Sequence, residues 1–210
     1  KFDAAIEQLQ ASHKTSSNWS QADETLQLLA ETFQRKKDPA AAKSTLEDLL
    51  KKYPNTRLKP QVEYRLGQIA ASSGQYDEAL ARYRTIVSDE AAKGFHGFAQ
   101  YGIAWSLMQQ EKYAEARKEL EPLLADGRTD SISQEALLAE GVCLRKTGKA
   151  KEAIEVLDKF LLGKPTGAAL GNALYESGMC FVELKQPEQA QTALAGPCDR
   201  FNSMTIGSHQ

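Results

Sequence analysis

Few residues in this chain have the type and spacing that acid–base or nucleophilic catalysis requires. The three histidines, His13, His96 and His209, fall in predicted loops or in the C-terminal tail, and no two of them share a helix face as a zinc-hydrolase motif would require. None has a serine, cysteine or carboxylate at a spacing known from catalytic arrangements. The stretch GKPTG at 163–167 lacks the spacing and the preceding strand of a phosphate-binding loop. We therefore predict that the protein is not an enzyme, and we assign no catalytic, cofactor-binding or metal-binding residue.

The three cysteines predict neither a zinc site nor a disulfide framework. Cys143, Cys180 and Cys198 are odd in number and contain no Cys-x-x-Cys pair, so we interpret them as small buried apolar residues. Cys143 and Cys180 should not bridge, because equivalent atoms of stacked helices lie about 8–10 Å apart and a disulfide needs Cα atoms within about 7 Å. Pairing of Cys180 with Cys198 stays open.

Composition limits the classes of partner. The 210 residues are 41% hydrophobic and 26% charged, which is typical of a globular chain, and the formal net charge is −2. This balance gives no reason to expect nucleic acid or an anionic membrane as partner. No apolar run approaches the ~18 residues of a membrane span.

The elements that must position any functional residue follow from an internal repeat. Six alanines recur at a spacing of 37 residues, each followed four residues later by leucine or tyrosine, and five small residues recur twelve residues before the later alanines. This regularity predicts a repeat architecture over the whole chain. The alanines are Ala5, Ala42, Ala79, Ala116, Ala153 and Ala190, and the small residues are Ala30, Gly67, Ala104, Gly141 and Gly178.

Each repeat is predicted to hold two helices, which we call A and B, and alternating strand patterns are absent. The A helices are predicted at about 23–36, 60–73, 97–110, 134–147 and 171–184. The B helices are predicted at about 39–52, 76–89, 113–125, 150–162 and 187–195, with a lone B helix at 1–11 and a tail at 196–210. Gly74 and Gly148 should end A helices, and Gly196-Pro197 should end the last B helix. We expect the small residues to let two antiparallel helices cross closely, with large side chains interlocking around them.

These positions resemble the tetratricopeptide repeat (TPR), whose pattern runs W-x2-L-G-x2-Y…A-x3-F…P. The best copy here is Leu66-Gly67, Ala70, Gly74, Tyr76, Ala79 and Tyr83. The resemblance implies an all-α, right-handed superhelix of antiparallel helix pairs, as one TPR-like domain over 1–210, with repeats at about 23–52, 60–89, 97–125, 134–162 and 171–195. The period of 37 departs from the family's 34, and we expect the three extra residues to lengthen the loops between repeats.

Residues 51–87 are also similar to repeats of bacterial envelope proteins, such as the Tol-Pal accessory protein and outer-membrane assembly lipoproteins. The Tyr-Pro-Asn-Thr stretch at 53–56 carries this second likeness. It leaves the compartment open between periplasm and cytoplasm, with a lean towards the envelope.

The family likeness also implies where binding would occur, because A helices line the concave face of such proteins. The positions beside the stacking residues are rich in Tyr, Trp and Met, which are enriched in binding hot spots. We therefore predict a non-catalytic scaffold that binds a peptide or partner helix in a groove centred on Phe98, Tyr101, Trp105 and Met108. The candidate protein-binding residues are Tyr64, Gln68, Phe98, Tyr101, Trp105, Met108, Leu138, Tyr175 and Met179. The alternative is that these side chains fill the space between A helices, in which case Tyr101 and Trp105 should both be buried.

A second reading of function is a structural part of a bacterial envelope complex that acts through oligomerisation or end-to-end docking. The first helix lacks an A partner before it, so Phe2 and Ile6 are expected to be exposed on one side. We favour a fragment of a longer repeat protein as the explanation, with self-association through this end as the alternative.

Overall fold

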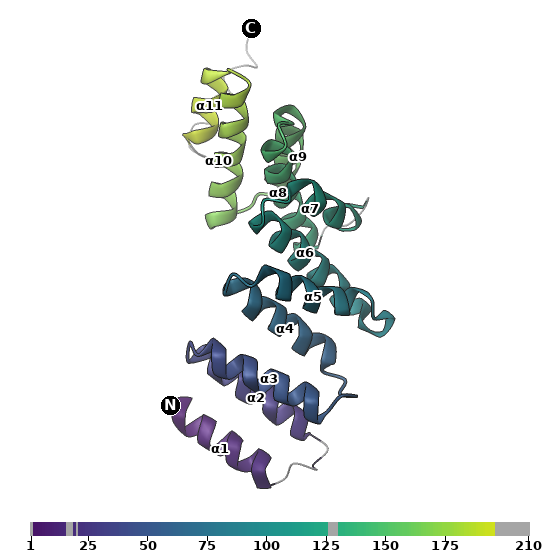
Figure 1. The fold of residues 1–210 in the computed structure, drawn as a ribbon. Helices are drawn as coiled ribbons and strands as arrows, with labels where there is room; N and C mark the ends of the chain where they lie inside the picture. The colour runs from purple at the N-terminus through teal and green to yellow at the C-terminus, as the bar shows by residue number, and fades with distance from the viewer. Residues whose placement is uncertain (1, 16–18, 20, 126–129, 196–210) are drawn as a thin grey trace. The chain divides into compact units, whose positions relative to one another are not determined.

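The computed structural model describes residues 2–15, 19, 21–125 and 130–195, and within these ranges it contains eleven α-helices, two short 3-10 helices and no strand. The chain divides into two compact units, unit 1 (residues 1–106) and unit 2 (residues 107–210), which are described separately. The helices are α1 (Phe2–Thr15), α2 (Ala22–Arg35), α3 (Pro39–Lys52), α4 (Lys59–Ser72), α5 (Tyr76–Val87), α6 (Lys93–Gln109), α7 (Tyr113–Leu120), α8 (Ser131–Lys146), α9 (Ala150–Leu162), α10 (Gly167–Glu183) and α11 (Pro187–Leu194) (Figure 1).

The helix order matches the predicted alternation, with differences at the helix ends. Every predicted B helix after the first begins where the sequence places it, at residues 39, 76, 113, 150 and 187. Three A helices begin three or four residues earlier than predicted, at residues 93, 131 and 167, and the other two begin one residue earlier. In these three repeats the extra residues of the 37-residue period lengthen the A helices instead of the loops that the sequence analysis expects them to lengthen.

The positions of two histidines also differ from the prediction. The first helix continues to Thr15, which places His13 in α1. A 3-10 turn at Glu90–Ala92, capped by the Asp89 side chain, leads directly into α6, so His96 lies in a helix as well. His209 and the tail lie outside the described residues.

The turn between the A and B helix of each repeat has one recurring backbone conformation. A residue with positive φ follows every A helix at the same register position: Lys37, Gly74, Glu111, Gly148 and Lys185, with φ between 60° and 77°. The N–H of the next residue then donates to the carbonyl five residues earlier, as in Asp38 N to Phe33 O at 2.9 Å. This is the Schellman arrangement, which satisfies carbonyls that the helix end leaves free.

The recurring small residues lie at helix crossings. Ala42, Ala79, Ala116 and Ala153 are fully buried. A Cβ added to Gly67 would lie 2.5 Å from the Tyr83 ring.

In unit 2, a Cβ on Gly141 would lie 2.6 Å from Leu157, and one on Gly178 would lie 2.6 Å from Leu194. The glycines thus make room for the large side chain that follows each alanine by four residues.

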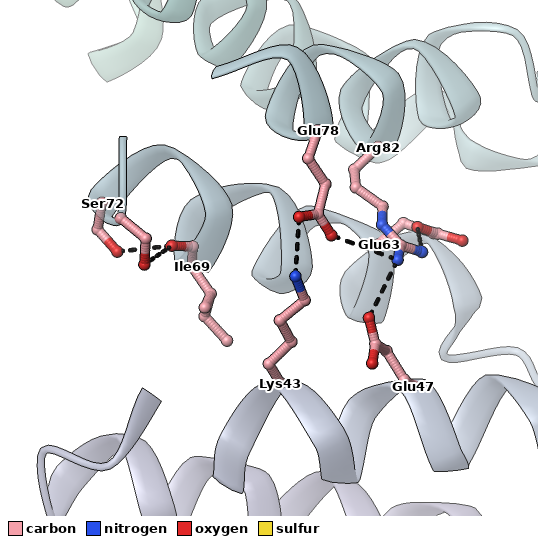
Figure 2. A network of polar contacts seen from close by, with 8 residues as sticks. Lys43, Glu47, Glu63, Ile69, Ser72, Glu78 and Arg82 are labelled. Carbon is pink, nitrogen blue, oxygen red and sulfur yellow. Dashed lines mark hydrogen bonds and ion pairs between the residues drawn. The ribbon is translucent and has the colours of Figure 1, made fainter. Parts of the chain in front are cut away.

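Successive B helices of unit 1 are joined by ion pairs. Lys43 Nζ of α3 donates to Glu78 Oε2 of α5 at 2.8 Å. Arg82 of α5 reaches two carboxylates, Glu63 Oε2 of α4 at 3.2 Å and Glu47 Oε1 of α3 at 3.4 Å. Figure 2 shows Lys43 and Glu47 rising from α3 towards the side chains of α5. These contacts link consecutive repeats.

The N-terminal helix is less exposed than predicted. Ile6 is 8% exposed and belongs to the core of unit 1 with Leu26 and Leu29 of α2, so the expectation that it is exposed is wrong. The reason is that α1 packs on α2 as a B helix packs on the A helix that follows it. Phe2, at 44% exposed, remains open as predicted.

Candidate protein-binding face

An aromatic face in unit 1 contains five of the predicted binding residues. Phe98 and Trp105 of α6 are 43% and 36% exposed, Tyr64 of α4 and Tyr101 of α6 are half-buried, and Gln68 of α4 is exposed. Neither Tyr101 nor Trp105 is buried. The condition under which the groove prediction would fail is therefore not met.

The rings of this face contact one another across three helices. The Tyr64 ring lies 5.9 Å from Phe98 and 6.4 Å from Phe95, measured between ring centroids. Trp105 meets Tyr76, the first residue of α5, edge-on at 6.1 Å. Edge-to-face contacts of this kind hold rings in defined orientations. The exposed ring surface is thus arranged before any partner arrives.

A buried tyrosine supports the aromatic face from below. Tyr83 of α5 inserts between α4 and α6, where a Cβ on Gly67 or Gly102 would lie 2.5 or 2.7 Å from its ring. Its centroid is 5.7 Å from that of Tyr64. Burial, with a smaller contribution from Tyr64, raises the pKa of the Tyr83 hydroxyl well above its usual value.

Sequence reasoning missed Phe95 and Gly102. Phe95 lies one helical turn before Phe98, so the i, i+3 spacing of two phenylalanines was the available signal. Gly102 has no counterpart among the recurring small residues. It is needed in this repeat because the residue it accommodates is Tyr83, where other repeats carry the smaller leucine.

Neighbouring A helices are bridged by polar side chains at one register position. In unit 1, Arg65 Nη1 of α4 donates to Gln34 Oε1 of α2 at 3.0 Å. In unit 2 the same two positions hold Glu176 of α10 and Arg145 of α8, and Arg145 donates to Glu176, so the donor and acceptor positions are exchanged.

Between α4 and α6 the corresponding positions are Ala71 and Gly102. No long polar side chain bridges these two helices at that register position, and the aromatic rings occupy this part of the A-helix layer.

The remaining predicted binding residues belong to unit 2. Met108, Leu138 and Met179 are half-buried, and Leu138 packs against the core of unit 2. Tyr175 of α10 is 54% exposed. Their role in binding stays a prediction.

Other chemistry-bearing groups are accounted for by packing. Cys143 and Cys180 are free and buried, and burial raises the pKa of their thiols to about 12 and about 11. Cys198 lies outside the described residues. Among the residues that the structure describes, no cluster of His, Cys, Asp and Glu is arranged to hold a metal ion, and no helix has the length and apolarity to cross a membrane.

Comparison with known families identifies the repeat. A model described as a tetratricopeptide repeat-like domain matches residues 1–98, and two models described as tetratricopeptide repeats match residues 101–169 and 172–196. The chain belongs to the tetratricopeptide repeat family. No curated protein matches this TPR chain.

Solved structures share the TPR fold. MamA from Desulfovibrio magneticus RS-1 matches with a TM-score of 0.70 at 16% identity, over 90% of this chain and 97% of that one. BtubC from P. vanneervenii matches with a TM-score of 0.72 at 15% identity, over 100% of this chain and 92% of that one. YrrB matches with a TM-score of 0.64 at 16% identity, over 97% of this chain and 100% of that one. The fold class is therefore an all-α TPR-type superhelix, as the sequence predicts.

Proposed function

We propose that this TPR chain is a non-catalytic scaffold, and that the aromatic face of unit 1 binds a peptide segment of a partner protein. The observation that carries the proposal is the exposed ring surface of Phe98 and Trp105, held by contacts with Tyr64 and Tyr76. Large exposed aromatic side chains are enriched among the residues that dominate binding energies. YrrB, which shares this fold, is described as a TPR protein with an unusual peptide-binding site.

The chemistry of the face favours an apolar segment. Phe98, Tyr101 and Trp105 are spaced at three and four residues along α6, so they form one stripe along the helix. Arg65, the basic residue next to Tyr64 on the adjacent helix α4, is already bonded to Gln34 and lies 3.8 Å from Glu31. A partner that presents apolar side chains at matching intervals would bury the rings without having to displace an ion pair.

Peptide selection followed by binding measurements tests the proposal. The chain has two tryptophans, so Trp19→Phe leaves Trp105 as the sole indole reporter. Peptides selected from a library of random dodecamers should shift the Trp105 emission on titration. Trp105→Ala, measured by calorimetry, should weaken binding by about tenfold or more, because a hot-spot side chain contributes ~2 kcal/mol.

Two further variants separate binding from folding. Phe98→Ala removes an exposed ring and should also weaken binding, with an unchanged melting temperature. Leu162→Ala, at a side chain of α9 that is 81% exposed in unit 2, is the matched control and should change nothing. Selected peptides that bind both aromatic variants as tightly as the unaltered chain would refute the proposal.

The same Trp105→Ala variant distinguishes the scaffold from the assembly role. Loss of a partner in a pull-down, with unchanged mass in light scattering, supports peptide binding. Unchanged partners with an altered oligomeric mass would support a structural role in an envelope complex.

A further inference from the structure

An open cleft of about 650 Å³ lies between α1 and α3 in unit 1, over α2. Its walls come from the C-terminal halves of α1 and α3, and its floor comes from α2. None of the residues of the aromatic face lines it, so it is a separate candidate site. The lining residues are Gln10, His13, Lys14, Leu26, Leu29, Thr45, Asp48, Lys52 and Tyr53.

In the next pair of B helices, a long charged side chain fills the equivalent space. Between α3 and α5, the guanidinium of Arg82 spans the gap and binds the carboxylates of Glu47 and Glu63 (Figure 2). One long charged side chain thus closes the junction of the two B helices over the intervening A helix.

One repeat earlier, the three counterparts are different residues. The position of Arg82 is held by Thr45, that of Glu47 by Gln10 and that of Glu63 by Leu26. All three line the cleft. The cleft exists because a short hydroxyl replaces the guanidinium, and its floor is apolar because leucine replaces the buried carboxylate.

The floor of the cleft is apolar and its rim is cationic. Leu26 and Leu29 are buried residues of the unit 1 core. Lys14 and Lys52 stand at the rim, and neither forms an ion pair with a carboxylate in the part of the chain that the structure describes. Asp48 is the acidic residue of the lining, so the lining carries two lysine charges against one carboxylate.

A histidine lies within hydrogen-bond distance of one of these lysines. Lys52 Nζ lies 3.5 Å from His13 Nε2, and because an ammonium group only donates, Nε2 is the acceptor. The His13 ring is itself set edge-on against Tyr53, with centroids 6.2 Å apart. This contact uses one hydrogen of the ammonium and leaves the other two available to a ligand.

The helix dipole partly explains why the two lysines lie at helix C-termini, but it leaves their ammonium groups available to a ligand. Lys14 and Lys52 lie in the last turns of α1 and α3, where a cation gains about 0.3–1 kcal/mol from the helix dipole. That long-range interaction occupies no ammonium hydrogen. An anion at the rim can therefore accept hydrogen bonds from both side chains.

We propose that this cleft binds a carboxylate attached to an apolar group, with the apolar group on Leu26 and Leu29 and the carboxylate at Lys14 and Lys52. Such a ligand satisfies both halves of the cleft at once, and the volume falls within the range of small-molecule sites. Two sources share this chemistry: a free medium-chain acid, and the C-terminal residue of a peptide that ends in leucine.

Binding of octanoate to the intact chain tests the proposal, with octanol and octylamine as matched probes. NMR shifts of the His13 ring and of the Leu26 and Leu29 methyl groups should saturate with octanoate. Octanol and octylamine should bind at least about tenfold more weakly, because they lack the charge that the two lysines recognise. Equal binding of octanoate and octylamine would overturn the proposal, as would no binding of octanoate.

Two variants locate the site. Lys14→Met/Lys52→Met should weaken octanoate binding at least about tenfold, whereas Lys146→Met on α8 is the control and should not. Gln10→Glu/Thr45→Arg copies the Glu47–Arg82 pair of the next repeat without changing the net charge. It should fill the cleft and abolish binding while the melting temperature stays the same or rises. Undiminished octanoate binding by either double variant would contradict the assignment.

Peptide probes distinguish the two sources of the ligand. A peptide ending in leucine that binds as the free acid but not as the C-terminal amide identifies a protein terminus. Octanoate binding without binding of the peptide acid identifies a free acid. Trp105→Ala should leave either interaction unchanged, which keeps this site independent of the aromatic face.

Discussion

The Tyr83 ring lies so close to Gly67 that a methyl group on this glycine would be 2.5 Å from Tyr83 Cε1. Real Cβ contacts do not approach this distance, so the helix pair α4–α5 requires glycine at this position. The same ring supports Tyr64, which links the packing of the core to the shape of the exposed aromatic face.

Gly67→Ala should therefore destabilise the protein by about 1–3 kcal/mol, the usual cost of overpacking a core. Gly94→Ala is the matched control, because Gly94 is also helical and a Cβ there would meet nothing within 4 Å. It should be neutral or stabilising, since alanine favours helix over glycine. Urea unfolding of the two variants checks this prediction, and equal stabilities would contradict it.

The left-handed residue after each A helix predicts that glycine is favoured at this position in every repeat, so introducing glycine should stabilise the chain and removing it should destabilise the chain. Glu111 has φ of 61°, so Glu111→Gly should stabilise the chain by about 1 kcal/mol through relief of backbone strain. Gly74→Ala should destabilise it by a similar amount. Lys112→Gly, at a residue with φ of −84°, is the control and should not stabilise. Melting temperatures suffice, and a stabilising Lys112→Gly would show that strain is not the cause.

The Arg82 network predicts a larger effect for a partly buried ion pair than for an exposed one. Arg82→Met leaves the nearly buried Glu63 carboxylate without its cation and should cost about 1–2 kcal/mol. Adding Glu63→Gln should recover part of that loss. Lys93→Met removes an exposed pair with Glu90 and should change stability by less than about 0.5 kcal/mol. Similar losses in Arg82→Met and Lys93→Met would exclude the proposed role of burial.

The buried thiols predict a loss of stability at alkaline pH. The pKa values of Cys143 and Cys180 are raised to about 12 and about 11 in the folded chain, against 9.0 for an exposed thiol. Above about pH 9 the unfolded chain releases these protons and the folded chain retains them, so the free energy of unfolding falls as pH rises.

The loss should be about 1 kcal/mol per thiol between about pH 8 and pH 10. Cys143→Ala/Cys180→Ala should show a shallower decline over the same range in urea unfolding. An identical pH dependence in the variant would rule out the thiols as its source.

The parts of the fold that the sequence could predict are those that recur at the same position of every 37-residue repeat. The recurring alanines predict that Ala79 lies at the crossing of two helices, and they predict the starts of the B helices. They can do so because each repeat needs a small residue at the same crossing. The early start of α6 depends instead on one local cap, in which Asp89 accepts from Ala91 N ahead of the 3-10 turn. The residues at the starts of α8 and α10 are different ones, Asp130 and Thr166, so the early helix starts leave no periodic signal in the sequence.

The candidate sites follow the same rule. The exposure of Trp105 and Phe98 could be predicted, because Trp105 directly follows the recurring Ala104 and Phe98 begins the same stripe of the helix. The α1–α3 cleft could not, because it arises where Thr45 differs from its counterpart Arg82, and the consequence of that difference appears only once the network around Arg82 is seen. Repetition predicts what the repeats share, and function in this chain is proposed where they differ.

The invariant left-handed bend inside each helix pair determines where the molecule can change length. Within a helix pair, the number of residues between the two helices is fixed, because the hydrogen bond from Asp38 N to Phe33 O and its equivalents close each turn. Connections between pairs vary, from the stretch 53–58 to the short 3-10 turn before α6. An additional 37-residue repeat inserted into the connection between Val87 and Lys93 should fold as one more helix pair. A single residue inserted beside Gly74 should instead disrupt the α4–α5 helix pair.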